Sequence, residues 1–195
     1  MFTWNVCMIE QEVIKAGAIL KAGGIILYPT DTIWGIGCDA SRQESVRNIY
    51  RIKQRDDFKS MLVLVKDISM LKTYVESIPI QALEILDSAA KPTTIIYPMA
   101  RNLAKNLLAP DGSVGIRITS DPFCSSLIAH TGKPIVSTSA NISGEDSPGT
   151  FYQIHRSILE QVDYVVDWRR NETKAAVPSA IIKVEADGSI TTIRE

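Results

Sequence analysis

Residues 23–37 narrow the possible folds more than any other stretch of the sequence. An apolar run at residues 25–28 follows two glycines and ends at a proline. A short apolar run with these boundaries is typical of a buried β-strand. Because proline cannot continue the hydrogen-bond ladder, the polar residues 30–32 should leave the sheet with free side chains. Gly35 and Gly37 should then let a second backbone segment approach closely.

Apolar runs alternate with helical patterns through the rest of the chain. Helical periodicity predicts helices near residues 10–22, 67–77, 80–90, 101–108 and 150–161. Two more helices should begin at local signals, a capping box of Ser41 with Glu44 and the Asp121–Pro122 pair. Strands are predicted at residues 61–65, 93–97, 114–118, 134–137 and 163–166, with a closing hairpin at 180–184 and 190–193. This alternation predicts one α/β domain with a mixed sheet.

The composition excludes several classes of protein. With 45% hydrophobic and 22% charged residues and a net charge of −1, the chain resembles an ordinary globular protein without a generally basic nucleic-acid-binding surface. Its three cysteines have no CxxC spacing, which indicates reduced, buried thiols and neither a zinc site nor disulfides. No signal peptide or membrane-spanning run is visible, so we expect a cytoplasmic protein with no membrane partner.

Polar clusters lie at the ends of several predicted strands, where open α/β sheets bind ligands. They are residues 30–32, the cations Lys53, Arg55 and Lys59, then Arg117, and residues 137–141. The three cations suit a polyphosphate, although cations also suit the C-terminal end of a helix. The hydroxyls and amide of the other clusters could bind a nucleotide or could simply cap turns.

The familiar catalytic fingerprints are missing from the sequence. Nothing matches a phosphate loop or a dinucleotide-binding loop, and no nucleophile–histidine pair or metal-ligand spacing is visible. Chemistry without a protein nucleophile would have to depend on positioning and charge stabilisation.

Six separated motifs occur in a characteristic order along nearly the whole chain. They are YPTDTIWGIG (28–37), KQR (53–55), PTTIIY (92–97), SVGIRIT (113–119), STSAN (137–141) and PSAIIKV (178–184), with Arg194 near the end. In these motifs the chain resembles the YrdC-like family, the L-threonylcarbamoyladenylate synthases. The resemblance implies a single YrdC-like domain over residues 1–195, without the C-terminal extension domain of longer relatives. It also implies a twisted mixed β-sheet with flanking helices around a concave cavity.

The resemblance implies a nucleotidyltransferase that joins L-threonine, bicarbonate and ATP into threonylcarbamoyl-AMP with release of pyrophosphate. Mg²⁺ would enter with ATP, and the protein itself would hold no metal. The product would go to downstream threonylcarbamoyl transferase proteins that modify tRNA, in the pathway of threonylcarbamoyladenosine synthesis. The resemblance further implies that tRNA or double-stranded RNA could be a direct binding partner.

The resemblance also implies the residues of the site. Lys53 and Arg55 would be catalytic, because they would stabilise charge on the departing pyrophosphate. ATP would be bound by Lys53, Arg55, Lys59, Ser113, Ser139, Asn141, Ser147 and Arg194. L-Threonine would be bound by Thr30, Thr32, Arg117, Ser139 and Ser179. We expect Lys53→Ala or Arg55→Ala to lower turnover with little effect on melting, and Thr32→Ala to weaken threonine far more than ATP.

Several positions depart from the family's pattern, and two other functions stay open. Ser60 and Met61 stand where the family has proline and leucine, Leu64 where some members have histidine, Trp34 for a tyrosine and Ala180 for a threonine. One alternative is a non-catalytic RNA-binding or ribosome-associated member of the same fold. The other is a related enzyme that uses a different carbamoyl, nucleotide or amino-acid substrate. Threonine-dependent release of pyrophosphate would distinguish the three.

Overall fold

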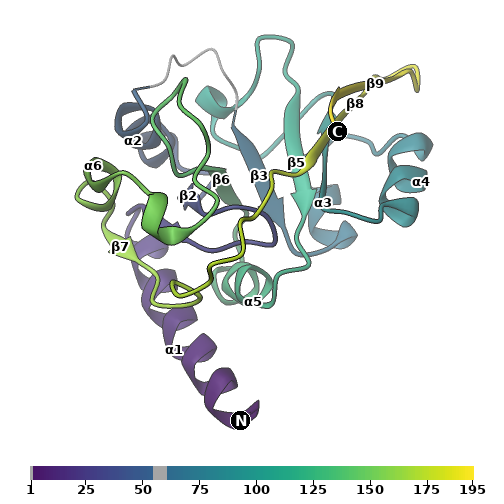
Figure 1. Cartoon of the computed structure of the whole chain (residues 1–195). Helices are drawn as coiled ribbons and strands as arrows, with labels where there is room; N and C mark the ends of the chain where they lie inside the picture. Colours follow the sequence, from purple (N-terminus) through teal and green to yellow (C-terminus); the bar gives the residue numbers. More distant parts are fainter. Residues whose placement is uncertain (1, 55–60) are drawn as a thin grey trace.

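The computed structural model describes residues 2–54 and 61–195, and only the backbone of residues 2–7. Within these ranges one mixed β-sheet has the strand order β7-β1-β2-β6-β3-β5-β4-β8-β9 (Figure 1). Its strands are β1 (Ile26–Tyr28), β2 (Gly35–Gly37), β3 (Leu62–Val65), β4 (Thr93–Tyr97), β5 (Val114–Ile118), β6 (Ile135–Ser139), β7 (Tyr164–Val165), β8 (Ala180–Val184) and β9 (Ile190–Arg194). The predicted α/β class with a mixed sheet is therefore confirmed.

Helices lie on both faces of this sheet. They are α1 (Phe2–Lys21), α2 (Gln43–Ile52), α3 (Ile68–Tyr74), α4 (Ile80–Ser88), α5 (Pro122–Thr131) and α6 (Arg156–Leu159), with the 3₁₀ turns η1 (Lys105–Leu107) and η2 (Phe151–Gln153). Within the described residues, none of the helices is both long enough and apolar enough to cross a bilayer.

The glycine-rich stretch after β1 forms a strand of its own, β2, between β1 and β6. It pairs antiparallel with both neighbours. A Cβ atom on Gly37 would lie 2.5 Å from the carbonyl oxygen of Val136 and 2.6 Å from the ring of Tyr28. The predicted close approach at this glycine is confirmed, whereas the strand itself was not anticipated because three residues carry too weak a pattern.

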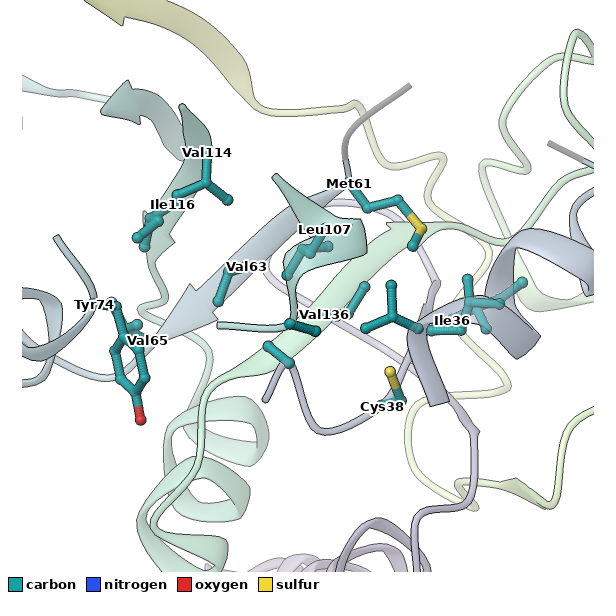
Figure 2. Packing of buried hydrophobic residues seen from close by; sticks show 14 of the residues in the cluster. Ile36, Cys38, Met61, Val63, Val65, Tyr74, Leu107, Val114, Ile116 and Val136 are labelled. Carbon is teal, nitrogen blue, oxygen red and sulfur yellow. The ribbon is translucent and has the colours of Figure 1, made fainter. Parts of the chain in front are cut away.

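One hydrophobic core lies between the sheet and helices α2, α3 and α4. Alternate residues of the central strands point toward it, among them Ile36, Val63, Ile116 and Val136. Figure 2 shows these side chains facing one another, with Leu107 of η1 inserted among them. Because side chains alternate along each strand, the neighbouring residues of the same strands must line the opposite face.

The second core lies on that opposite face, under α1 and α5. Ile26 and Tyr28 of β1, Leu64 of β3 and Ile135 of β6 pack there against the two helices. The predicted start of α5 is confirmed, because the Asp121 carboxylate accepts a hydrogen bond from the Cys124 amide at 2.9 Å. This core covers only part of the face, and β4, β5 and β8 contribute no side chain to it. The functional cavity described below occupies the uncovered part.

The predicted helix at residues 101–108 is wrong except for the single turn η1. Asn102 has a φ of +58°, which a right-handed helix does not allow. Its side-chain amide donates to the carbonyl oxygen of Thr73 at 2.8 Å, and the Arg101 amide donates to that of Tyr74 at 2.9 Å. Bonds to the end of α3 thus replace the bonds that would have continued a helix.

The predicted capping box before α2 is also wrong. The helix begins after Arg42, whose side chain makes no capping hydrogen bond. The hydroxyl of Ser41 donates to the Asp39 carboxylate at 2.6 Å, and Glu44 pairs with Arg47 at 2.7 Å. A carboxylate two residues earlier therefore competes successfully for the hydroxyl, as aspartate commonly does in turns.

The predicted helix at residues 150–161 is two short helices, η2 and α6. The side-chain oxygen of Gln153 accepts from the amides of Gly149 and Thr150, at 2.8 and 3.0 Å, which closes the first turn. The ring of His155 accepts from the Ser157 amide at 3.2 Å and starts the second helix. Local caps therefore divide a segment whose apolar periodicity predicted one helix.

Candidate functional site

A cavity of about 230 Å³ opens on the uncovered part of the α1–α5 face. Several strand residues that line it are small, namely Gly35 on β2, Thr94 on β4, Gly115 on β5 and Ser137 on β6, and the larger Leu62, Ile96 and Ile181 lie beside them. A Cβ atom on Gly115 would lie 3.3 Å from a methyl carbon of Thr94, so a larger residue there would fill the hollow. The cavity therefore exists because adjacent strands carry small side chains on the same face.

Hydroxyl groups from five segments converge on the cavity. They belong to Thr32, Thr94, Ser137, Thr138, Ser139, Ser147 and Ser179. The hydroxyls of Thr94 and Ser179 lie 2.9 Å apart and are both buried. Since β4 and β8 are neighbours, this pair joins two segments that are 85 residues apart in the chain. Among the described residues, the cavity thus offers many short hydrogen-bonding groups and no nucleophile with an activating base.

The turn after β1 presents Thr32 to the cavity and keeps Thr30 behind it. The Thr30 hydroxyl donates to the carbonyl oxygen of Ile33 at 2.8 Å and accepts from the Thr32 amide at 3.0 Å. The two threonine hydroxyls lie 3.0 Å apart. Because the single proton of Thr30 is already used, the Thr32 hydroxyl must be the donor of this contact. Its oxygen lone pairs then remain available to a ligand that donates an N–H.

Arg117 brings a buried positive charge to the same cavity. Its side chain is 2% exposed, and one guanidinium nitrogen lies 2.9 Å from the Asp31 carboxylate. Among the described residues, neither Arg117 Nε nor Asp31 Oδ1 has an aligned hydrogen-bond partner. A guanidinium with spare donors at a cavity wall suits a carboxylate or a phosphate, which it binds in a bidentate manner.

Arg194 on β9 supplies the second positive charge. Its Nε donates to the carbonyl oxygen of Ser179 at 2.9 Å, and its side chain lines the cavity. Burial and the nearby charge of Arg117 lower the pKa of Arg194, although an arginine stays protonated at neutral pH. Two like charges in one cavity repel each other, so an anionic ligand between them would relieve the repulsion.

Lys53 is not among the residues that line this cavity. Its side chain is 1% exposed, and its ammonium donates to the carbonyl oxygens of Ser139 and Asn141 at 2.5 and 2.7 Å. These bonds fix the backbone of the serine-rich motif that follows β6. The predicted contact between Lys53 and ATP stays a prediction. Arg55 and Lys59, predicted beside it, lie outside the described residues.

Two other predicted ATP ligands use their polar groups within the protein. The Ser113 hydroxyl donates to the Asp111 carboxylate at 2.6 Å, and hydrogen bonds from Ser113 lower the pKa of Asp111 to about 2. The Asn141 amide donates to the carbonyl oxygens of Ile142 and Glu145, at 2.9 and 2.7 Å. Its Oδ1 is buried and has no hydrogen-bond partner among the described residues. That oxygen remains available to a donor from a ligand or from water.

The structure therefore brings together part of the predicted site. Residues on the cavity are Thr32, Arg117, Ser139, Ser147, Ser179 and Arg194. Thr30, Lys53, Ser113 and Asn141 do not line it. Ser137 and Thr138 line it as members of the predicted polar cluster 137–141, whereas Thr94, Trp34, Met61 and Leu62 line it without having been predicted as ligands. The alternation of strand residues was a usable signal for Thr94, but its role depends on a partner strand that no local pattern identifies.

Of the described positions that depart from the family's pattern, two line the cavity and two do not. Leu64 is fully buried in the core under α1 and α5, and Ala180 lies on β8 opposite Thr93. Trp34 and Met61 do line the cavity, whereas Ser60 lies outside the described residues. No group of three or more histidine, cysteine, aspartate or glutamate side chains in the described part of the chain is placed to hold a metal ion.

Comparison with known proteins gives consistent matches over most of the chain. The family model Sua5_yciO_yrdC, which carries the description telomere recombination, matches residues 18–195. A threonylcarbamoyl-AMP synthase of Pseudoalteromonas translucida is 33% identical over 164 residues, which cover 82% of this chain and 88% of that protein. A threonylcarbamoyl-AMP synthase of Xanthomonas euvesicatoria is 32% identical over 182 residues, which cover 90% of this chain and 94% of that protein.

Solved structures share the fold. E. coli YciO matches with a TM-score of 0.81 at 25% identity, covering 94% of this chain and 88% of that chain. P. abyssi Sua5 complexed with L-threonine matches with a TM-score of 0.82 at 20% identity, covering 93% of this chain. This chain spans 53% of that Sua5 chain, and at such identity the likeness establishes the fold alone.

Proposed function

Because the chain belongs to the Sua5/YciO/YrdC family, we propose that it makes threonylcarbamoyl-AMP from L-threonine, bicarbonate and ATP, with release of pyrophosphate. The observation that carries this proposal is the pair Arg117 and Arg194 in one cavity lined by hydroxyls. Curated relatives that match along most of their own length are named for this activity. The chain is accordingly an enzyme, a nucleotidyltransferase of tRNA modification.

The reaction needs two bonds to form and two to break. The amine of L-threonine adds to the carbon of bicarbonate, water leaves, and a carbamate results. An oxygen of the carbamate then attacks the α-phosphorus of ATP, and the bond to pyrophosphate breaks. No group of the protein has to form a covalent bond in this sequence. The protein contributes alignment of the reactants and stabilisation of negative charge.

The cavity supports a binding mode for the amino acid. Its volume of about 230 Å³ lies below the ~300–1,000 Å³ of pockets for larger ligands, so it suits L-threonine better than a whole nucleotide. Arg117 would bind the carboxylate of L-threonine through its spare donors. Thr32, whose oxygen can accept, would receive the N–H of the amine or carbamate, and the Thr94–Ser179 pair would face the substrate side chain.

ATP would extend from the cavity toward the loop that carries Asn141 and Ser147. Arg194 and the hydroxyls of Ser139 and Ser147 would bind its phosphates and ribose, and the free oxygen of Asn141 would accept from the nucleotide. The pyrophosphate would leave toward the segment of Lys53, Arg55 and Lys59, whose charges suit it. In this assignment both substrates contact the serine-rich motif, residues 137–141.

The proposal also includes a metal ion, downstream partners and a cellular location. Mg²⁺ would enter with ATP and be held mainly by its phosphate oxygens, as is usual for this ion. The product would pass to a separate transferase that acts on tRNA. This protein would also contact tRNA or double-stranded RNA directly. A cytoplasmic location is supported by the buried free thiols of Cys38 and Cys124.

Pyrophosphate release tests the proposal. Purified protein is supplied with ATP, Mg²⁺ and bicarbonate, with and without L-threonine, and threonine-dependent release is expected. ATP binding without such release would favour a different carbamoyl or amino-acid substrate. If neither ATP nor L-threonine binds and RNA binds with a steep salt dependence, the non-catalytic alternative is correct.

A substitution tests the placement of the two substrates. Thr32→Ala should raise the KM for L-threonine about tenfold, as expected for the loss of one good hydrogen bond, and leave the KM for ATP within about twofold. Thr192→Ala, on the exposed strand β9, is the matched control and should change neither. Equal weakening of both substrates would mean that the cavity has been assigned to the wrong one.

A further inference from the structure

Arg169 lies away from the cavity and contacts the turn that carries Thr32. One of its terminal nitrogens, Nη1, donates to the Asp121 carboxylate at 2.7 Å and to the carbonyl oxygen of Thr30 at 3.2 Å. Its Nε donates to Glu172 at 2.8 Å. The backbone of Arg169 has a φ of +61°, which is uncommon for a residue other than glycine. A sparsely populated backbone conformation held by three side-chain contacts indicates that the surroundings fix this residue firmly.

Asp121 connects Arg169 to the rest of the fold. Its carboxylate is 4% exposed, and its second oxygen caps α5 by accepting from the Cys124 amide at 2.9 Å. Removing the cation from a buried carboxylate leaves that charge without compensation. The ion pair therefore holds Arg169 in a fixed place relative to α5, and through α5 relative to the sheet.

The turn after β1 is held from several sides. The Cys124 thiol donates to the carbonyl oxygen of Pro29 at 3.4 Å, and the Ser120 amide donates to Asp31 at 3.3 Å. Arg169 is the donor to Thr30 between them. Thr30 in turn braces Thr32 through its hydroxyl. A displacement of the Thr30 carbonyl would therefore be transmitted directly to the side chain that faces the cavity.

Arg169 also begins the segment that returns to the other side of the cavity. We call residues 169–178 the connecting segment; it runs between β7 and β8 and is yellow-green in Figure 1. The connecting segment ends at Pro178, which lines the cavity together with the next residue, Ser179. Thr32 and Ser179 are two predicted threonine ligands. Arg169 links them, because its side chain contacts Thr30 next to Thr32 and its backbone begins the connecting segment that leads to Ser179.

We propose that Arg169 is a positioning residue for the amino-acid substrate, which together with Asp121 fixes the spacing between Thr32 and the connecting segment that leads to Ser179. This inference depends on the proposed function of the cavity. Misplacement of a binding group by about 1 Å can cost on the order of 100-fold in rate. Of the groups assigned to ATP, Ser139 ends β6, Asn141 and Ser147 lie on the loop after it and Arg194 lies on β9. The described hydrogen bonds of the Arg169 side chain go to none of them. The connecting segment also bonds to that loop, through the Ala176 amide and the Gly149 carbonyl oxygen at 3.1 Å, but the Arg169 side chain itself contacts the turn of Thr32. The larger effect should therefore fall on L-threonine.

Three variants test this role by steady-state kinetics. Arg169→Gln should raise the KM for L-threonine about tenfold or more, which corresponds to the loss of charged hydrogen bonds, with the KM for ATP within about twofold. Arg169→Lys should recover part of the loss, since an ammonium can still pair with Asp121. Glu172→Gln is the matched control, because it removes the negative charge of the exposed partner of Arg169 and leaves both contacts to Asp121 and Thr30 in place.

A second measurement reports on the turn without using activity. Hydrogen exchange of the amides at residues 30–34 should be faster in Arg169→Gln than in the wild type, and unchanged in Glu172→Gln. An Arg169→Gln protein with unchanged exchange there, or with equal increases in both KM values, would overturn the positioning role. Wild-type protein that releases no pyrophosphate in response to L-threonine would instead contradict the proposed function. The hydrogen-exchange measurement would then still test whether Arg169 positions the turn.

Discussion

The ammonium of Lys53 donates hydrogen bonds to the carbonyl oxygens of Ser139 and Asn141, at 2.5 and 2.7 Å. Its side chain is 1% exposed, so these bonds must compensate for lost hydration. Removing the ammonium would leave two carbonyl groups without this donor. At the scale of the residue, Lys53 therefore supports the loop that the substrates are expected to share.

This geometry revises the expected effect of removing Lys53. Lys53→Met should lower the free energy of unfolding by about 1–3 kcal/mol, as is usual when buried polar groups lose their partner, in addition to lowering turnover. The expectation from the sequence, little effect on melting, followed from the position of Lys53 outside the apolar strands. Urea unfolding followed by circular dichroism measures the effect.

Arg51→Met is the control for this prediction. Arg51 lies on the same helix, α2, and its side chain is exposed. Its replacement should change the unfolding free energy by no more than about 0.5 kcal/mol. A Lys53→Met protein as stable as Arg51→Met would contradict the supporting role of the two hydrogen bonds.

At the scale of the element, β2 depends on glycine because it lies between two close neighbours. A Cβ atom on Gly37 would meet a backbone oxygen at 2.5 Å, and backbone cannot move aside as a flexible side chain can. Gly37→Ala should therefore destabilise the protein by about 1–3 kcal/mol or more. Gly115→Ala is the control, because its closest neighbour is a methyl group at 3.3 Å. Equal urea midpoints for the two variants would contradict the close approach of β2 and β6.

Glu12 joins α1 to Tyr164 of β7 and to Asp167, which lies just after that strand. Its carboxylate accepts hydrogen bonds from the Tyr164 hydroxyl at 2.7 Å, the Asp167 amide at 2.6 Å and the Lys15 ammonium at 2.8 Å. Burial by itself raises the pKa of Glu12, but these hydrogen bonds outweigh it and hold the pKa below its ordinary value of 4.5. A carboxylate with a lowered pKa in the folded state contributes stability above the unfolded-state pKa and loses it as the pH falls through the folded-state pKa.

Glu12→Gln should consequently destabilise the protein at neutral pH by about 1–3 kcal/mol, the usual range for hydrogen bonds to a charged group. The difference from the wild type should become smaller as the pH falls below 4.5. Glu10→Gln, at an exposed position of the same helix, should show no such dependence. A Glu12→Gln effect that does not change with pH would contradict a role for the ionised carboxylate. Urea unfolding at a series of pH values measures it.

At the scale of the whole molecule, the cavity is built from both halves of the sheet. Thr32 follows β1, Arg117 lies on β5 and Arg194 on β9, so a ligand that binds all three stabilises the folded domain. At a free concentration of about 100 times Kd, binding should add about 2.7 kcal/mol. For a domain of this size that corresponds to a rise in Tm of about 5–11 °C.

Thermal unfolding with L-threonine and ATP–Mg²⁺ measures this stabilisation. D-Threonine is the control ligand, because it has the same groups in an arrangement that cannot reach the same partners together. Equal shifts with the two enantiomers would contradict a specific amino-acid site. The absence of any shift with L-threonine and ATP–Mg²⁺ at saturating concentrations would contradict the ligand assignment of the cavity.

The sequence by itself determined the elements that have local signals. The β-branched run closed by a proline gave β4 its predicted bounds, residues 93–97, and the Asp121–Pro122 pair marked the start of α5. Glycine and aspartate patterns likewise predicted the closing hairpin of β8 and β9. These predictions succeeded because capping groups, proline and β-branched side chains act on the backbone within a few residues.

Only the tertiary structure decided how these elements combine. The strand order brings Thr94 beside Ser179, and Arg117 and Arg194 to one cavity. The same packing buries the ammonium of Lys53 and replaces a predicted helix near Asn102 with bonds to α3. Register between distant strands, burial and the hollow left by small side chains arise only when segments far apart in the chain meet. No local pattern encodes them, which is why the sequence predicted single elements better than the geometry of the site.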